Sequence, residues 1–383
     1  MTINPFHYNP ELTLTQKALQ INWGLVLIVC ALAGIGCAML YSAANGSMQP
    51  WAAQQGLRFL AALPMMLVVA LFDVRFLFKW TWIIYLGGLG ALIAVEVMGT
   101  VGMGAQRWID LYIIQLQPSE LMKVVLVITL ARYFHGLSEE DTTRPGRLIP
   151  PLILLAIPVA LVLKQPDLGT AGILIMIGGA MFFAAGVRLW KFAAVGGATA
   201  AAIPVIWQFL HDYQKQRILT FLNPSSDPLG AGYHITQSKI ALGAGGVFGK
   251  GFLQGTQSHL NFLPEKQTDF IFTMLAEEFG LIGGLGLLGL YVLVFAYGFA
   301  ISLRARNHYG RLMAIGLTVN LFLYVFINIA MVMGLIPVVG VPLPLISYGG
   351  TAMLAVMVSF GLLLSVSVHR DVRIPRRGLD DDG

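Results

Sequence analysis

Charged residues are scarce in this chain of 383 residues. Asp, Glu, Lys and Arg together make up 11% of it, whereas a soluble domain carries roughly 25%. Hydrophobic residues reach 57%, which is more than a soluble core of this length needs. The composition therefore excludes an ordinary soluble protein, and length alone does not support two independent soluble domains.

Cysteine is also scarce, because the chain has only Cys30 and Cys37. On one helix these residues would be separated by about 10 Å of rise, which is too far for a disulfide. They therefore carry no information about the redox compartment. The hydrophobic stretch that holds them has no Ala-x-Ala cleavage signal, so we expect a retained helix there rather than a signal peptide.

Hydrophobic blocks of about twenty residues fill most of the chain, and each is long enough for a helix to cross ~30 Å of hydrocarbon. About ten such blocks are predicted. Their ranges are 22–42, 57–73, 81–98, 119–134, 149–163, 168–187, 189–210, 269–302, 312–335 and 345–368. We therefore predict an all-α polytopic membrane protein that forms one transmembrane domain over residues 1–383.

Most Lys and Arg residues fall on one side of the membrane when the blocks are counted by alternation. These residues are Lys17, Arg75, Lys79, Arg132, Arg144, Arg147, Arg188, Lys191, Arg304, Arg306, Arg311, Arg370, Arg373, Arg376 and Arg377. The positive-inside rule places this side in the cytoplasm. Both termini, 1–21 and 369–383, are then cytoplasmic. The formal charge of +5 follows from this topology and does not indicate nucleic-acid binding.

The remaining basic residues lie on the exoplasmic side, several of them at a helix mouth. They are Arg58, Arg107, Lys123, Lys164, Lys215, Arg217, Lys239, Lys250 and Lys266. The topology rule does not explain them. Charges in such positions are costly and are usually paired or functional.

Two short segments on this side, 117–120 (QPSE) and 165–168 (QPDL), have the same form. Pro followed by Ser or Asp predicts the start of a helix. The positive ends of both helix dipoles would then face the basic residues, a setting that favours an anion such as pyrophosphate. The alternative is that Ser119 and Asp167 only cap helices and that the charges pair among themselves.

The longest connection, residues 211–268, lies between the seventh and eighth predicted helices on the exoplasmic side. Loops of this length are usually functional or disordered, and its many aromatic residues argue against disorder. Residues 235–242 (ITQSKIAL) have apolar positions at helical spacing and predict a short surface helix. The glycine-rich run 243–255 must bend sharply, but it lacks the Gly-Lys-Ser/Thr ending of a nucleotide loop.

The end of this connection carries Thr268 and Asp269, just before an apolar block. Either residue stands where an N-cap belongs, so one interpretation of Asp269 is a capping carboxylate. The other interpretation is a lone carboxylate at the mouth of a polar cavity, which suits a general base. A helix N-terminus would keep it ionised and therefore able to accept a proton.

Several segments resemble the SEDS family (shape, elongation, division and sporulation) of peptidoglycan glycosyltransferases. They are 104–109 (GAQRWI), 117–120 (QPSE) with Lys123, 165–170 (QPDLGT), 263–272 (LPEKQTDFIF), 277–280 (EEFG) and 342–350 (PLPLISYGG). The likeness covers about residues 20 to 368. Residues 223–224, 227–234 and 237–239 resemble the elongation members of the family. One departure is Gln267, where the family usually has His before the Thr-Asp pair, and this puts any proton-transfer role of that position in doubt.

The resemblance implies that lipid II is both donor and acceptor, that transfer inverts the anomeric carbon, and that undecaprenyl pyrophosphate leaves. Asp269 would be the general base. Cations would hold the departing pyrophosphate. The predicted substrate-binding residues are Arg58, Arg107, Gln117, Ser119, Glu120, Lys123, Lys239 and Ser347. Glu120 and Lys123 lie one helical turn apart and are expected to pair. No metal ligand is identified, although a divalent cation that assists the pyrophosphate is compatible with the resemblance.

The resemblance further implies a class B penicillin-binding protein, which is a transpeptidase, as a partner within the elongation machinery, in addition to membrane lipids. Two other classes of function remain as alternatives. A lipid II flippase would also be polytopic, but transporters tend to place charges at the membrane midplane, whereas here they gather at one face. A non-catalytic membrane scaffold would use the long connection as a docking surface.

Overall fold

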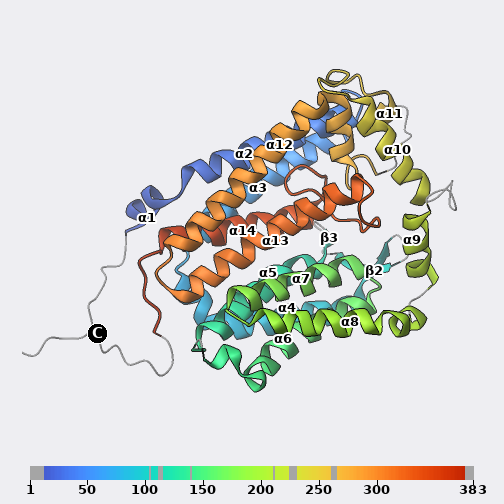
Figure 1. Ribbon diagram of the computed structural model, residues 1–383. Helices are drawn as coiled ribbons and strands as arrows, with labels where there is room; N and C mark the ends of the chain where they lie inside the picture. The colour runs from blue at the N-terminus through green and yellow to red at the C-terminus, as the bar shows by residue number, and fades with distance from the viewer. Residues whose placement is uncertain are drawn as a thin grey trace, which may run out of the picture.

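The computed structural model is an elongated bundle of helices (Figure 1). It describes residues 13–102, 105–110, 115–138, 140–209, 212–223, 231–259 and 265–375. Its helices are α1 (Leu14–Gln20), α2 (Trp23–Ala43), α3 (Trp51–Leu71), α4 (Val74–Met98), α5 (Pro118–His135), α6 (Pro145–Lys164), α7 (Leu168–Ala184), α8 (Leu189–Phe209), α9 (Asp212–Leu222), α10 (Ala231–Ala244), α11 (Thr256–His259), α12 (Ile271–Arg304), α13 (His308–Val332) and α14 (Gly350–Val368), with a 3-10 turn η1 (Asp141–Thr143). The predictions for 1–12, Gly104, 224–230, 263–264 and the tail beyond 375 concern residues outside this description.

The predicted hydrophobic blocks each overlap one long helix, from α2 to α8 and from α12 to α14. Among the described residues, seven helices are long and apolar enough to cross a membrane, namely α2, α3, α4, α6, α12, α13 and α14. Helices α7 and α8 contain shorter apolar stretches. The predicted fold class, an all-α polytopic membrane protein, is confirmed, and the count of about ten crossings stays a prediction.

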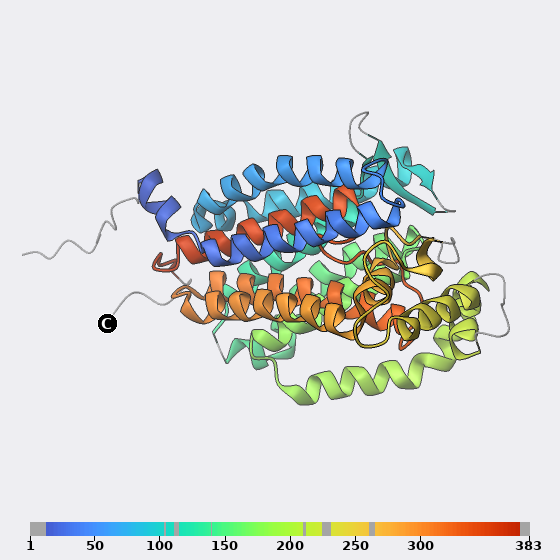
Figure 2. The same ribbon diagram turned by 90° about the horizontal axis from the view of Figure 1, so that it is seen from above.

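The centre of the bundle is formed by α13 and α14. Of their apolar stretches, 72% and 78% are buried, against 22% in α4. The outer helices instead expose leucine, isoleucine and valine side chains, as expected where lipid covers the surface. Helix α8 lies at the edge of the bundle (Figure 2), and most of its side chains are exposed. Cys30 and Cys37 on α2 are both free thiols, which agrees with the expected spacing.

A small antiparallel sheet connects α4 to α5, and the sequence analysis did not predict it. Its strands are β1 (Thr100–Gly102), β2 (Ala105–Asp110) and β3 (Gln115–Leu116), in the order β1-β2-β3. Trp108 pairs with Thr100, and Ile109 pairs with Leu116. Strands this short leave no alternation long enough to recognise in a sequence. The sheet carries Arg107, one of the predicted substrate-binding residues.

The long connection is folded at the end of the bundle away from α1, where Figure 1 shows α9, α10 and α11. The helix predicted at 235–242 lies within α10, so that prediction is confirmed. This helix is docked rather than free, because Ile235, Ser238 and Ala241 form one buried face. The hydroxyl group of Ser238 lies 2.9 Å from that of Thr273 and donates to the carbonyl oxygen of Val332 at 2.8 Å.

The glycine-rich run fills a break in α12. Gly280 has φ 66° and ψ −161° inside this helix, which interrupts its hydrogen bonds. Groups of the run replace them, with Leu281 N–H donating to Gly246 O, Ile282 N–H to Val247 O, Lys250 N–H to Glu277 O and Gly251 N–H to Glu278 O. The predicted sharp bends are confirmed by positive φ angles at 246, 249 and 251. A Cβ atom at Gly249 would lie 2.1 Å from the carbonyl oxygen of Glu278, so the fit requires glycine.

Candidate active site

Asp269 lies in a turn of residues 265–270 just before α12. The helix begins at Ile271 with Phe270 as its N-cap, and the side chain of this N-cap residue makes no capping hydrogen bond. The prediction that Thr268 or Asp269 caps this helix is therefore wrong. The Thr268 hydroxyl group instead donates to Glu265 Oε2 at 3.0 Å. This hydrogen bond lies within the turn, and the helix begins only after it. Asp269 is half-buried and precedes the N-cap residue of the helix.

The same turn contains Lys266, which is buried. Burial lowers the pKa of its ammonium group below the ordinary value of 10.5. The cause is desolvation, which disfavours the charged form of the amine.

The main chain of Asp269 is held by Asn328 on α13. Asn328 Nδ2 donates to the carbonyl oxygen of Asp269 at 3.0 Å and to that of Val341 at 2.7 Å. Asn328 is fully buried. The sequence analysis did not select this residue, although a polar amide inside an apolar spanning helix is a recognisable signal. On its other side the carboxylate approaches Gly340, where an added Cβ atom would lie 3.4 Å from Asp269 Oδ2.

Ser347 fastens the turn to the segment that precedes α14. Its hydroxyl group donates to the carbonyl oxygen of Thr268 at 2.6 Å and accepts from Leu343 N–H at 2.8 Å. The next N–H group, from Tyr348, donates to Gln267 O at 2.8 Å. These contacts make Ser347 a positioning residue, and its predicted contact with substrate stays a prediction. Gln267 stands in place of the usual His, and its Nε2 donates a hydrogen bond to Glu265 Oε2 at 3.3 Å.

Arg58 on α3 belongs to the same group of contacts. Its guanidinium carbon lies 4.8 Å from the centre of the Tyr348 ring, within range of a cation–π interaction. A Cβ atom at Gly350 would lie 3.5 Å from that guanidinium carbon, so Arg58 stands at the N-terminus of α14. Gln55, nearby on α3, donates to the carbonyl oxygen of Ser347 at 2.9 Å. The structure thus brings Arg58 and Ser347 to the turn that carries Asp269.

Glu120 and Lys123 form the predicted ion pair, with 2.6 Å between Glu120 Oε1 and Lys123 Nζ. Both side chains are buried between α5 and α13. The hydroxyl group of Tyr324 on α13 donates to the other carboxylate oxygen of Glu120, and Lys123 Nζ lies 4.2 Å from the centre of the Tyr324 ring. Tyr324 and Ser347 also line one cavity of about 10 Å³, room for roughly one water. The pair and the Asp269 turn are therefore close neighbours.

Arg107 on β2 is bound to the entry of α7. Its Nη2 donates to Pro166 O at 2.6 Å and its Nε to Gln165 O at 3.3 Å, and Nε lies 3.7 Å from Asp167 Oδ2. Asp167 caps α7 as predicted, because its side chain accepts from Thr170 N–H at 3.1 Å. Arg107 is still 29% exposed.

Gln117 and Ser119 lie at the start of α5. Pro118 is the first residue of this helix, as predicted, but Ser119 is buried in the first turn and does not cap it. The N–H group of Gln117 donates to Thr351 Oγ1 at 3.3 Å, which ties this start to α14. Lys239 is exposed on α10, where its side chain covers Gly334.

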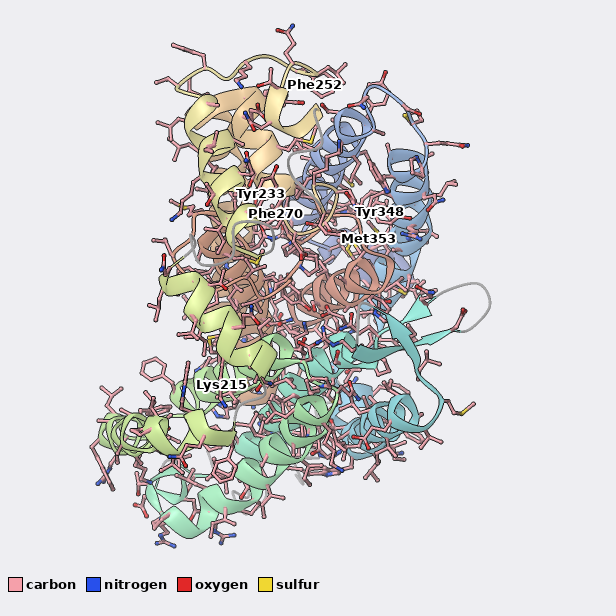
Figure 3. All side chains as sticks on the ribbon, turned by 90° about the vertical axis from the view of Figure 1, so that its right-hand side faces the viewer. Lys215, Tyr233, Phe252, Phe270, Tyr348 and Met353 are labelled. Atoms are coloured by element: carbon pink, nitrogen blue, oxygen red, sulfur yellow. The ribbon has the colours of Figure 1, made fainter. Side chains whose placement is uncertain are left out.

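The end of the bundle that carries these residues faces the viewer in Figure 3. Phe270, next to Asp269, and Tyr348 lie near its middle, whereas Lys215 on α9 lies well to one side. The predicted exoplasmic cations therefore do not form one cluster. Among the described residues, no group of three His, Cys, Asp or Glu side chains could hold a metal ion, so we derive no step through a metal.

Glu277 is a fully buried carboxylate that the sequence analysis left without a role. It lies on α12 beside the break and is 0% exposed. Lys250 Nζ lies 3.0 Å from Glu277 Oε1, and the N–H of Gln257 donates to the same oxygen at 2.9 Å. The residue thus holds the glycine-rich run against α12. The adjacent acidic pair in an apolar block was the signal that could have found it.

These features define a polytopic membrane protein that carries, at one end of a helical bundle, a turn with Asp269, the arginine Arg58 and the buried ion pair of Glu120 and Lys123. The sequence model of the FtsW, RodA and SpoVE family, described as a cell cycle protein, matches residues 17–372. The chain belongs to this family, and the SEDS resemblance is thereby confirmed.

The chain is 43% identical over 366 residues to the peptidoglycan glycosyltransferase MrdB of Escherichia coli (strain K12), covering 94% of this chain and 97% of that one. A solved structure described as "Structural coordination of polymerization and crosslinking by a peptidoglycan synthase complex" is similar, with a TM-score of 0.79, 32% identity and coverage of 91% and 98%. RodA of Thermus thermophilus gives a TM-score of 0.69, 28% identity and coverage of 91% and 97%. These similarities support the elongation type within the family.

Proposed function

We propose that this chain is a peptidoglycan glycosyltransferase that polymerises lipid II into glycan strands during cell elongation. The observation that carries the proposal is the placement of Asp269, which is half-buried in the turn before α12 and lies next to the segments that hold Asn328 and Ser347. Its main chain is bonded to Asn328, so the group has a defined position. The similarity to MrdB, matched along nearly its whole length, supports the same activity.

Asp269 acts as the general base in this mechanism. The C4 hydroxyl group of the acceptor lipid II loses its proton to the carboxylate as its oxygen attacks the anomeric carbon of the donor. A new glycosidic bond forms while the bond from the anomeric carbon to the pyrophosphate oxygen breaks, and the configuration inverts. Undecaprenyl pyrophosphate leaves with the bonding electron pair.

Negative charge develops on the departing pyrophosphate, and fixed cations stabilise it. Of Arg58, Arg107 and Lys239, Arg58 is tied most directly to the base, because it packs on Tyr348, which is bonded to Gln267 in the turn before Asp269. Arg107 and Lys239 complete the proposed set. Arg107 is positioned by backbone carbonyl groups, which leaves part of its guanidinium group exposed.

The buried pair of Glu120 and Lys123 shapes the floor of the site through Tyr324. An ion pair in this position is costly unless its remaining atoms are bonded, and Tyr324 provides that bond. Gln117 and Ser119, at the start of the same helix, are proposed to face the substrate, and Ser347 is proposed to do so from the opposite segment. A divalent cation, if it takes part, would arrive on the pyrophosphate oxygens.

A class B penicillin-binding transpeptidase is the proposed partner within the elongation machinery. The similar structure with a TM-score of 0.79 is described as a complex that coordinates polymerization and crosslinking. Crosslinking requires a second activity, and a transpeptidase supplies it for new strands.

The orientation we propose places both termini in the cytoplasm of a bacterial inner membrane and Asp269 at the exoplasmic face. The basic residues at the α1 end of the bundle support it through the positive-inside rule. Pyrophosphate-linked sugar would then be polymerised outside the cytoplasm, where the wall is built.

One reconstitution distinguishes the proposed activity from its alternatives. Purified protein is incubated with lipid II in detergent, and glycan chains are resolved by gel; in parallel, labelled lipid II is followed across vesicles that contain the protein. Long glycan chains without a partner support the proposal. Transbilayer movement of lipid II without glycan polymer would establish a flippase. If the protein shows neither activity, the scaffold alternative remains.

A further inference from the structure

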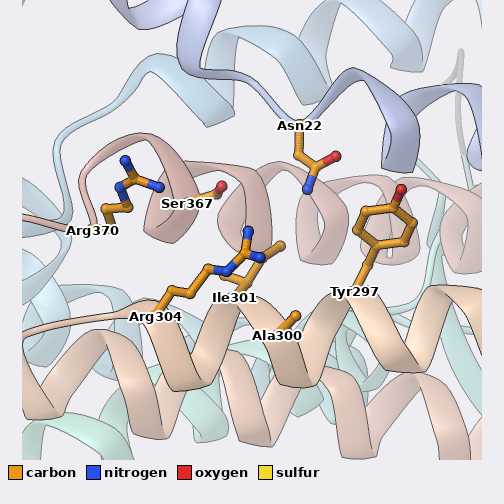
Figure 4. Close-up of a pocket in the computed structure, with 7 residues that line it drawn as sticks. All are labelled: Asn22, Tyr297, Ala300, Ile301, Arg304, Ser367 and Arg370. Atoms are coloured by element: carbon orange, nitrogen blue, oxygen red, sulfur yellow. The ribbon is translucent and has the colours of Figure 1, made fainter.

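A second polar pocket lies at the end of the bundle opposite Asp269. It has a volume of about 90 Å³ and lies between the start of α2 and the ends of α12 and α14. Asn22 lines it just before α2, Tyr297 and Arg304 line it from α12, Ser367 from the end of α14 and Arg370 just after α14 (Figure 4). A single water needs roughly 10–15 Å³ of such space, so the pocket admits a larger polar group.

Hydrogen-bond donors converge on this pocket without protein partners. Across the described part of the chain, the side chains of Tyr297, Arg304 and Ser367 make no hydrogen bond or ion pair, and Figure 4 shows them facing the space between α12 and α14. Asn22 uses its Oδ1 to accept from Leu25 N–H at 3.4 Å, which leaves its amide hydrogens. Three kinds of donor aimed into one cavity match the acceptor oxygens of an anion.

The charge balance at this end also favours an anion. Asp371 is the acidic residue next to the pocket, and it lies 3.1 Å from Arg306 Nε and 3.5 Å from Arg370 Nε. One carboxylate group therefore serves two guanidinium groups. Arg304 adds a third positive charge that no carboxylate in the described residues offsets. Electrostatics alone would draw a negative group to this position.

The level of the pocket relative to the membrane identifies the source of that anion. Arg304 is the last residue of α12, and its neighbours Leu303 and Phe299 expose 79% and 47% of their surface to the outside of the bundle. Trp23, beside Asn22, is 50% exposed. Tryptophan next to apolar, lipid-facing side chains is typical of the headgroup level of a bilayer. The pocket thus opens where lipid phosphates lie.

We propose that this pocket binds the phosphate group of an anionic phospholipid in the leaflet opposite Asp269. Arg304 and Arg370 contact the phosphate oxygens, and Tyr297, Ser367 and Asn22 donate the remaining hydrogen bonds. The acyl chains lie along Leu303 and Phe299 on α12. The site joins three helix ends, so a bound lipid would hold α2, α12 and α14 together far from the chemistry.

The test is lipid binding to the purified full-length protein in detergent, followed by native mass spectrometry during titration with phosphatidylglycerol. Arg304→Gln combined with Arg370→Gln should weaken the tightest bound lipid by about tenfold or more. Ala300→Phe should do the same without a change of charge, because Ala300 lines the pocket. Arg306→Gln is the matched control, since this arginine lies outside the pocket, and it should change affinity by less than about twofold.

Melting temperatures without added lipid verify that each variant is folded, and phosphatidylethanolamine and inorganic phosphate complete the comparison. Both should bind more weakly than phosphatidylglycerol, and phosphate should not displace it. Unchanged affinity in both the double variant and Ala300→Phe would overturn the proposal. Displacement by millimolar phosphate would overturn the assignment to a lipid and leave a site for a soluble anion.

Discussion

Asn328 on α13 donates a hydrogen bond of 3.0 Å to the main-chain carbonyl oxygen of Asp269, two residues before α12 begins. The same amide group donates a hydrogen bond of 2.7 Å to the carbonyl oxygen of Val341, so one buried side chain joins the two segments that meet at the site. Residues 59 positions apart are thereby fixed to each other. The position of the proposed base depends on this contact.

Replacing Asn328 with Leu should reduce polymerisation by about tenfold or more, because a displaced base loses its alignment. It should also lower the free energy of unfolding by about 1–3 kcal/mol, since the buried carbonyl group of Val341 and the partly buried one of Asp269 lose their donor. The rate per folded molecule, measured with lipid II, separates these effects. Asn320→Leu is the control, because Asn320 is buried on the same helix and its side chain makes no hydrogen bond in the described residues. Equal activity loss in both variants would contradict the positioning role.

The Glu120–Lys123 pair should tolerate neither single charge reversal. Glu120→Lys or Lys123→Glu places two like charges in a buried position, which costs several kcal/mol and distorts the site. Polymerisation should fall while membrane insertion stays normal. The double reversal should recover only part of the activity, because Lys at position 120 cannot accept the hydrogen bond from Tyr324. Full activity in both single variants, assayed with lipid II, would show that the pair is incidental.

The break in α12 yields a prediction about stability. Gly280→Ala should lower the melting temperature, because φ is 66° and a Cβ atom would lie 2.3 Å from Gly249 N; strain of this kind costs roughly 1–3 kcal/mol. Gly243→Ala, at the start of the glycine-rich run that packs against this break, is the matched control, since nothing lies within 4 Å of its added Cβ atom. It should leave the melting temperature unchanged or slightly raised. A Gly280→Ala protein as stable as the control would contradict the proposed fit.

Much of the architecture could be predicted from the sequence, because burial in lipid leaves a local signal. A helix in hydrocarbon must satisfy its own backbone, so twenty apolar residues in a row specify it, whatever surrounds them. The pairing of Glu120 with Lys123 is equally local, since three residues correspond to about one helical turn. The capping of α7 by Asp167 is local in the same way, because its side chain bonds to the N–H group three residues later.

Contacts between distant segments could not be predicted in this way. Nothing in the sequence near Asn328 indicates that its amide reaches Asp269, because the contact depends on how α12 and α13 pack. The capping interpretation of Thr268 or Asp269 failed for a related reason: the Thr268 hydroxyl group bonds to Glu265 within the turn, and the helix starts only at Ile271. The strands β1 to β3 form because they pair with each other, and their own residues do not predict a strand.

Topology supplies a test of the proposed orientation. A reporter fused after Gly383 and another inserted near Ser226 should report opposite compartments, the first cytoplasmic and the second exoplasmic. Alkaline phosphatase and a fluorescent protein, each active on one side only, provide the readout. If both positions are cytoplasmic, the number of crossings is wrong by one and the site does not face the wall.

The central claim is that Asp269 is the general base. Asp269→Asn preserves size and polarity, and no cap is lost because Phe270 is the N-cap, so the melting temperature and membrane abundance should barely change. Glu265→Gln serves as the matched control in the same turn, because its amide oxygen can still accept from Thr268.

The decisive measurement is the initial rate of glycan synthesis from lipid II by purified wild-type protein, Asp269→Asn and Glu265→Gln. Loss of a general base typically lowers the rate by a factor of about 10² to 10⁴. We predict a loss of this size for Asp269→Asn, with Glu265→Gln remaining close to wild type. Polymerisation by a folded Asp269→Asn protein at a near-normal rate would contradict the account.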